Sequence, residues 1–152
     1  MANPLYGSNK DDSVLDAVAS GLTRGHATLP LATDCYLTSA DSGKVIFVDA
    51  TGAGAEVDIN LPAVSAGLNF KFIVAENTPS QDVKIISGGT ICYGTLSIQS
   101  DTNEDNRVAL AGSTNVLIDS TALKGDWLEY YCDGTSWYVR GMGSVQGAFT
   151  VS

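Results

Sequence analysis

The stretch GDWLEYYCDGTSWYVRG, residues 125–141, decides the fold class of this chain. Two runs rich in aromatic residues flank Asp133-Gly134, a dipeptide that favours a tight hairpin turn because both residues tolerate positive φ. A loop of two or four residues gives the same facing of the side chains, since successive residues of a strand point to opposite sides. One side of the predicted antiparallel hairpin carries Leu128, Tyr130, Cys132, Trp137 and Val139, and the other carries Trp127, Glu129, Tyr131, Tyr138 and Arg140.

Both sides of this hairpin are aromatic, although a hairpin with one solvent-exposed side should be polar on that side. One sheet cannot bury both sides by itself. Either loops or the N-terminal segment of the same chain cover the second side, or another subunit does. The low charge content of the chain favours the second interpretation. We therefore predict a subunit interface formed by Trp127, Tyr131, Tyr138 and Arg140.

The chain from residue 28 onward repeats the two-residue period of β-strands. In residues 55–61, AEVDINL, apolar and polar residues alternate strictly, which indicates a half-buried strand. Further strands are predicted at 44–50, 69–75, 82–87, 90–99, 107–111, 115–119, 126–133, 136–141 and 145–151. Short strands separated by turn residues, with no helical stretch between them, are typical of an all-β, antiparallel β-sandwich or barrel. We assign residues 28–152 to this domain, and the pattern excludes parallel α/β folds.

Residues 1–27 have a different character. Asn3, Pro4 and Gly7 interrupt any early element, and Ser13 then offers an N-cap to a short helix that Gly21 would end. Such a short helix needs a surface to receive its apolar side. We therefore predict an N-terminal arm with one helical turn, docked on its own domain or on a partner.

Composition narrows the possible functions. Only 16% of the 152 residues are charged, against roughly 25% in an average domain. The net charge of −9 repels nucleic acid and anionic membranes, so neither is an expected partner. Three cysteines without paired spacing indicate free thiols, and the first residues lack the features of a signal peptide. These features predict a soluble protein synthesised in a cytoplasm.

Candidate catalytic residues are scarce. The one histidine, His26, has no nucleophile motif beside it. Glu56 and Asp58 have the spacing of a glycosidase pair, but the alternation of their strand already explains them as a solvated face. Residues 101–105, DTNED, begin like a calcium loop yet lack the later glycine and glutamate, so an acidic hairpin loop is favoured. We expect no catalytic, cofactor-binding or metal site, and keep a small glycan hydrolase as a third hypothesis.

Three segments carry a family resemblance: LPAVSAG at 61–67, NFKFIV at 69–74 and GDWLEYYCDGTSWYV at 125–139. They resemble small all-β structural proteins of tailed bacteriophages, a group that includes capsid decoration (cement) proteins and modules of tail and head fibres. The resemblance covers residues from about 44 to 141. The opening MANPLYG is similar to the start of decoration proteins from phages of aquatic bacteria.

The resemblance implies a non-enzymatic homotrimer on the outer capsid surface of a virion, made in the bacterial host cytoplasm and bound to the major capsid protein. The β domain would form the trimer. The arm would touch the capsid through Asn3, Pro4, Leu5 and Tyr6. The alternative is a tail- or head-fibre module that binds a host receptor or a carbohydrate. The lack of a coiled-coil, collagen or other repeat favours the capsid.

Overall fold

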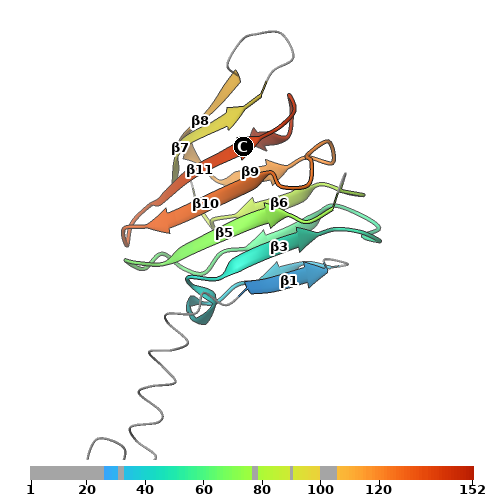
Figure 1. Cartoon of the computed structure of the whole chain (residues 1–152). Coiled ribbons are helices and arrows are strands. Elements are labelled where there is room, and N and C mark those ends of the chain that lie inside the picture. Colours follow the sequence, from blue (N-terminus) through green and yellow to red (C-terminus); the bar gives the residue numbers. More distant parts are fainter. Residues whose placement is uncertain (1–25, 31–32, 77–78, 90, 100–105) are drawn as a thin grey trace, which may run out of the picture.

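The computed structural model describes residues 26–30, 33–76, 79–89, 91–99 and 106–152. The strands of this part of the chain form two sheets that pack face to face (Figure 1). The front sheet has the order β1-β3-β5-β10-β11-β7-β8, and the back sheet has the order β12-β9-β6-β4-β2. The all-β sandwich predicted from the alternation of apolar residues is thereby confirmed.

Each strand lies close to where the two-residue period predicts it, apart from β1 and β2. The front sheet contains β1 (His26–Pro30), β3 (Val45–Asp49), β5 (Asn69–Val74), β7 (Cys92–Ile98), β8 (Asn106–Ser113), β10 (Trp127–Cys132) and β11 (Trp137–Gly143). The back sheet contains β2 (Cys35–Tyr36), β4 (Val57–Asn60), β6 (Val83–Ile86), β9 (Asn115–Ile118) and β12 (Phe149–Val151). A single 3-10 turn, η1 (Ser39–Asp41), is the one helical element of the described residues. None of their helices is long and apolar enough to cross a membrane.

The sheets are mixed, whereas the sequence predicts antiparallel neighbours. Five of the ten pairings between described strands are parallel: β1–β3, β3–β5, β2–β4, β4–β6 and β7–β11. The physical reason is the path of the chain, which passes from one sheet to the other between successive strands from β1 to β6. Each sheet therefore receives every second strand in the same direction. Antiparallel pairing involves the later strands, in the hairpins β7–β8 and β10–β11 and in the pairs β5–β10, β6–β9 and β9–β12.

The core lies between the sheets and is rich in aromatic rings from the front sheet. Phe70, Phe72, Tyr130 and Trp137 are almost completely buried. Their ring centroids lie 5.7 Å apart for Phe72 and Tyr130, and 5.9 Å apart for Phe70 and Trp137. Burying such a side chain stabilises the fold by about 1.5–3 kcal/mol. The inward half of the hairpin, from Leu128 to Val139, is thus buried as predicted.

One buried carboxylate ties the ends of this hairpin together. Asp126, 2% exposed, accepts hydrogen bonds from the backbone N–H of Leu123 at 2.9 Å and from that of Ser144 at 3.0 Å. The Ser144 hydroxyl donates a third bond, at 2.5 Å. Because one side chain satisfies donors before β10 and after β11, it fixes both strands that present the hairpin.

Candidate functional site

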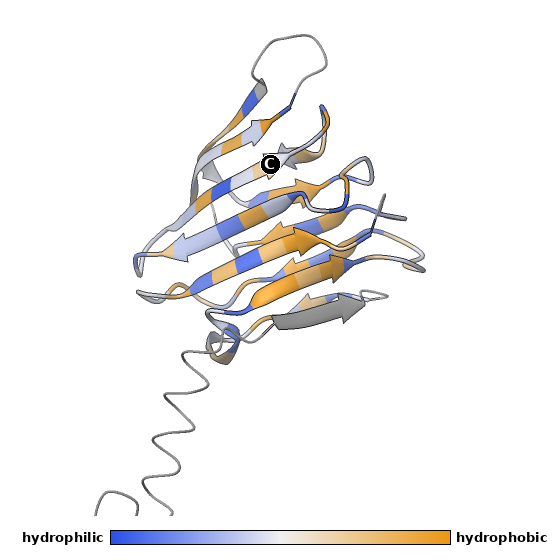
Figure 2. Ribbon diagram, viewed as in Figure 1, coloured by the Kyte–Doolittle hydropathy of each residue, from blue (hydrophilic) through white to orange (hydrophobic). Residues whose placement is uncertain are grey.

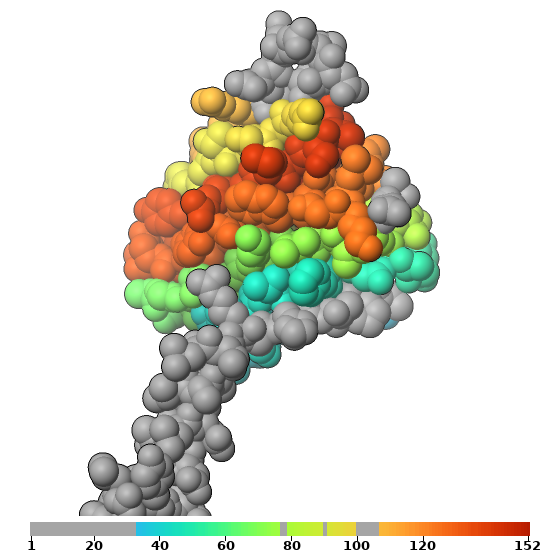
Figure 3. All heavy atoms as spheres, in the orientation of Figure 1, coloured from blue at the N-terminus to red at the C-terminus, as the bar shows by residue number. Residues whose placement is uncertain are grey.

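The outward side of the front sheet is the candidate site, and we call it the aromatic face. It consists of the outward side chains of β5, β10, β11 and β7, with those of β3 and β8 at its flanks. Inward and outward residues alternate along each of these strands, as the burial pattern of β11 illustrates. Figure 3 views the molecule from this side, where β3, β5, β10 and β11 form adjacent bands. In Figure 2 apolar residues recur along the same strands.

Strand register arranges these side chains in three rows that run across the sheet. The first row is Phe47, Ile73, Trp127, Met142, Ser97 and Arg107. The second row is Val45, Lys71, Glu129, Arg140, Thr95 and Ala109. The third row is Asn69, Tyr131, Tyr138, Tyr93 and Ala111.

The third row is a line of exposed tyrosines on three neighbouring strands. Tyr93, Tyr131 and Tyr138 are 42%, 45% and 49% exposed, and Met142 of the first row is 54% exposed. Tyr138 donates a hydrogen bond from its hydroxyl to Asp133 at 3.0 Å, which raises the pKa of the tyrosine. The three rings lie next to one another on adjacent strands, and a contiguous group of exposed rings is a candidate contact surface.

An ion network occupies the second row, in which one carboxylate, Glu129, pairs with two cations, Lys71 and Arg140. Glu129 lies 3.0 Å from the Lys71 ammonium and 2.7 Å from the Arg140 guanidinium, and accepts a hydrogen bond from the Tyr131 hydroxyl at 3.1 Å. Burial acts to raise the pKa of Glu129, but the donors on Lys71, Arg140 and Tyr131 outweigh it, so that the pKa is lowered. A carboxylate held by several donors is a fixed part of the surface.

The two cations of this network also lie over aromatic rings. The Lys71 ammonium is 4.9 Å from the ring centroid of Trp127, and the Arg140 guanidinium carbon is 5.7 Å from that of Tyr131. These contacts are short enough for cation–π attraction and limit the rotamers of both rings. A hollow of about 40 Å³ lies beside Lys71 and Glu129 of this network. The face is therefore ordered and suited to a broad partner surface.

All four residues predicted as interface, Trp127, Tyr131, Tyr138 and Arg140, lie together on this face. Trp127 is half-buried and the other three are exposed. Sequence reasoning missed Tyr93, Met142 and Lys71. Lys71 and Tyr93 come beside the hairpin only through the pairing of β10 with β5 and of β11 with β7. Met142 lies on β11 itself, which continues to Gly143, beyond the predicted end of that strand at residue 141.

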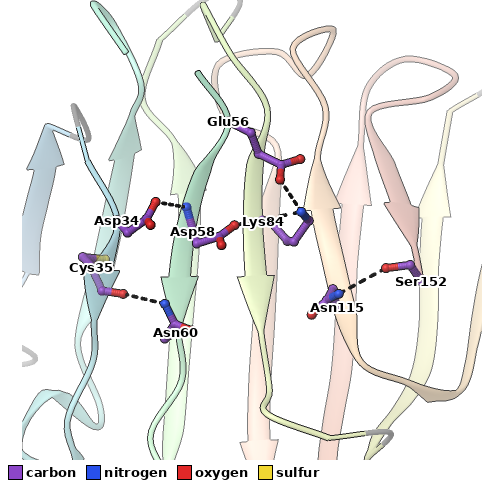
Figure 4. Close-up of polar contacts among 8 residues, drawn as sticks. All are labelled: Asp34, Cys35, Glu56, Asp58, Asn60, Lys84, Asn115 and Ser152. Atoms are coloured by element: carbon purple, nitrogen blue, oxygen red, sulfur yellow. Dashed lines mark hydrogen bonds and ion pairs between the residues drawn. The ribbon is translucent and has the colours of Figure 1, made fainter. Parts of the chain in front are cut away.

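Other candidate residues lie apart from the aromatic face. Glu56 and Asp58 are on the outward side of the back sheet, where Lys84 of β6 pairs with Glu56 and lies 4.0 Å from Asp58 (Figure 4). The lysine occupies the position between the two carboxylates. His26 begins β1, opposite Val45. Asn3, Pro4, Leu5, Tyr6, the predicted helix and residues 101–105 lie outside the described residues.

The cysteines match the prediction of free thiols. Cys92 and Cys132 are buried and Cys35 is partly buried, and none of the three forms a disulfide. Burial raises the pKa of both Cys35 and Cys92, and Asp34 and Asp41 add to the effect at Cys35. In the part of the chain that the structure describes, no three His, Cys, Asp or Glu side chains come close enough to bind one metal ion.

Comparisons of the chain with protein-family models, with curated proteins and with solved structures found no match.

Proposed function

We propose that this chain is a non-enzymatic structural protein of a tailed-phage virion. It decorates the outer capsid surface as a homotrimer and stabilises the shell by binding the major capsid protein. The sequence segments at 61–74 and 125–139 support the family, and the aromatic face supports the mode of action.

The observation that carries the proposal is the aromatic face itself. Tyr93, Tyr131 and Tyr138 remain 42–49% exposed on a sheet whose other side is packed into the core. Rings held in place on a rigid sheet lose little conformational entropy on contact, which is why such residues dominate protein interfaces. A face built in this way is suited to permanent assembly with another protein surface.

Decoration of a capsid needs a stiff body that presents the same contact several times. A closed cyclic oligomer provides this, because each subunit offers an identical arm and body to the shell. Several weak contacts made together then give persistent attachment. Binding only to the assembled lattice adds free energy to that state alone, so the shell is stabilised without any chemical step.

The proposed capsid contacts are Asn3, Pro4, Leu5 and Tyr6 of the N-terminal arm. Deleting residues 2–12 tests them. We expect the truncated chain to form trimers of normal mass and to leave the capsid surface unoccupied in cosedimentation with purified shells. Normal occupancy after this deletion would remove the arm from the proposal.

Copy number in the virion tests the proposed location. Purified particles of the phage that encodes this chain are digested and quantified by mass spectrometry against labelled peptides of the chain and of the major capsid protein. Decoration predicts hundreds of copies per particle, in fixed ratio to the capsid protein. Absence from the particle would refute the proposed function.

The alternative is a fibre module that binds a host receptor or a carbohydrate. The tyrosine row favours it, because exposed rings on a flat sheet can stack against sugar rings. A fibre predicts a few dozen copies per particle or fewer. It also predicts that Tyr138→Ala weakens binding to host-surface glycans on an array, whereas a subunit interface predicts a change in oligomeric mass.

A further inference from the structure

The two halves of the aromatic face differ in side-chain size. On β3 and β5 the outward residues are large: Val45, Phe47, Lys71 and Ile73. On β7 and β8 the same two rows hold Ser97, Thr95 and Ala109 beside Arg107, so this half is mostly small. The longest side chains stand between them on β10 and β11. In these two rows the face is therefore a ridge with one large flank and one small flank, whereas the third row has Asn69 on β5 and the larger Tyr93 on β7.

We propose that in the trimer this face is covered by the same face of two other copies, around an axis that runs parallel to the strands. The large flank of each copy, β3 and β5, packs on the small flank of the next copy, β8 and β7. The inference rests on the proposed homotrimer and names the surface that forms it. Unlike flanks that fit each other make a head-to-tail contact, which closes into a ring after a fixed rotation.

Charge favours this face over the outward side of the back sheet. The second row carries Lys71 and Arg140 around a single acid, Glu129. On the back sheet Lys84 instead lies between two acids, Glu56 and Asp58, and a third acid, Asp34, accepts a hydrogen bond from the backbone N–H of Asp58 (Figure 4). Copies with a net charge of −9 repel one another, so they approach most easily through the face that lacks excess acid.

Charge also selects the register of the contact. If the threefold axis passes in front of the gap between β10 and β11, β10 of one copy meets β11 of the next copy, and β5 meets β7. Glu129 then faces Arg140 of the next copy, and Lys71 faces the neutral Thr95. Moving the axis to the front of β10 would place Lys71 opposite Arg140, and like charges at an interface are costly. The first arrangement is therefore the one that the second row allows.

Side-chain length favours three copies over two. Two sheets packed face to face keep a nearly constant separation of about 10 Å. In such a dimer the long side chains of Tyr131 and Tyr138 would face each other at the centre, and the shorter side chains of Val45 and Ala109 would face each other at the flank. One separation cannot suit both pairs, so either the centre would be overfilled or the flank would be left empty. Three sheets around an axis leave most room at the centre and least at the corners, which matches long residues on β10 and β11.

The exposed area is large enough to support such a contact. The exposed fractions of the three tyrosines add up to about 1.4 tyrosine side chains. This is about 270 Å² if a full tyrosine side chain is taken as about 200 Å². The face spans six described strands from β3 to β8, about 24 Å across at about 4.8 Å per strand. The tyrosines alone would supply about a third of the roughly 800 Å² that each partner buries in a standard interface, and the remainder would come from other outward side chains of these strands.

Cysteine trapping tests the inference. Val45→Cys and Ala109→Cys are combined in the full chain with Cys35→Ser, and the protein is treated with a short bis-maleimide. Because each copy then carries both reactive positions, we expect covalent trimers of about 47 kDa, three times the 15.8 kDa chain, on denaturing gels. In each of the two single variants the new cysteine faces no engineered cysteine of the next copy, so only monomers should appear on the gel.

A second pair of variants separates contact from folding. Ala109→Arg places a long charged side chain on the small flank, at an exposed position that folding does not use. We expect it to abolish the trimer in light scattering, while the matched control Ala55→Arg, exposed but outside the face, keeps it. Circular dichroism spectra should be the same for both.

Every other result counts against the inference. Covalent dimers would show a two-fold contact, cross-linking in a single variant would show like-on-like packing, and no cross-linking would show that the face is uncovered or covered by the arm. If the chain is abundant on virions but does not cross-link, the inference fails and the proposed function stands. If it cross-links but is absent from virions, the proposed function fails and the inferred trimer surface stands.

Discussion

Replacing Gly94 of β7 by alanine should destabilise the domain strongly, because the added Cβ atom would overlap the backbone of the neighbouring strand β11. Its φ is +146°, and a Cβ atom there would lie 1.9 Å from the carbonyl oxygen of Val139 and 2.9 Å from its carbon. Non-glycine residues avoid this conformation at a cost of about 1–3 kcal/mol. The overlap would also force the strands apart and weaken at least two ladder hydrogen bonds, each worth about 1 kcal/mol.

The expected loss is about 3–5 kcal/mol, a large share of the roughly 5–15 kcal/mol that a domain has. For a chain of 152 residues this lowers Tm by about 6–20 °C. Gly54→Ala is the matched control, since its Cβ would meet nothing within 4 Å and its φ is not positive. Both changes restrict the unfolded chain equally. Thermal unfolding is followed by circular dichroism at one protein concentration. A Gly94→Ala variant that melts within about 2 °C of Gly54→Ala would refute the reasoning.

Three further outcomes are expected. Asp126→Ala removes the buried acceptor of three hydrogen bonds, each worth about 1 kcal/mol, so urea unfolding should show a loss of about 3 kcal/mol, and an unchanged midpoint would contradict the role of Asp126. Hydrogen bonds from Lys44 and Thr38 lower the pKa of Asp41 to about 2, so its stabilisation is complete above pH 4 and is lost as the pH falls towards 2. The difference in Tm between the native chain and Asp41→Asn should shrink over that window, and a constant difference would exclude it. Tyr131→Asp should give monomers or aggregates in light scattering, because it places a carboxylate beside Glu129, and an unchanged oligomer would remove Tyr131 from the interface.

The facing of the hairpin's side chains could be predicted from sequence, because it depends only on local alternation and on a loop of even length. β10 and β11 pair with Cys132 opposite Trp137, which leaves a loop of four residues, 133–136. All five residues assigned inward are buried. The five assigned outward are exposed or half-buried. Here local patterning and tertiary packing agree.

The neighbours of the hairpin could not be predicted, because alternation says nothing about which strands pair. Tyr93 reaches Tyr138 through the parallel pairing of β7 with β11, two strands far apart in the chain. β1 and β2 were not named as strands. β2 has only two residues, and β1 contains Pro30, which a strand tolerates at an edge. The sequence therefore predicts the part of the candidate site on β10 and β11, but not the part on the neighbouring strands β5 and β7.

The alternation of the chain between the sheets from β1 to β6 bears on how a domain of this kind can change in size. Each circuit lays one strand on the front sheet and one on the back sheet, so β1 and β2 finish the two sheets at the same end of the sandwich. At the opposite end β8 and β12 lie against each other. Duplication of one circuit could thus lengthen the molecule at the β1–β2 end by two strands at once, and the aromatic face would keep its shape.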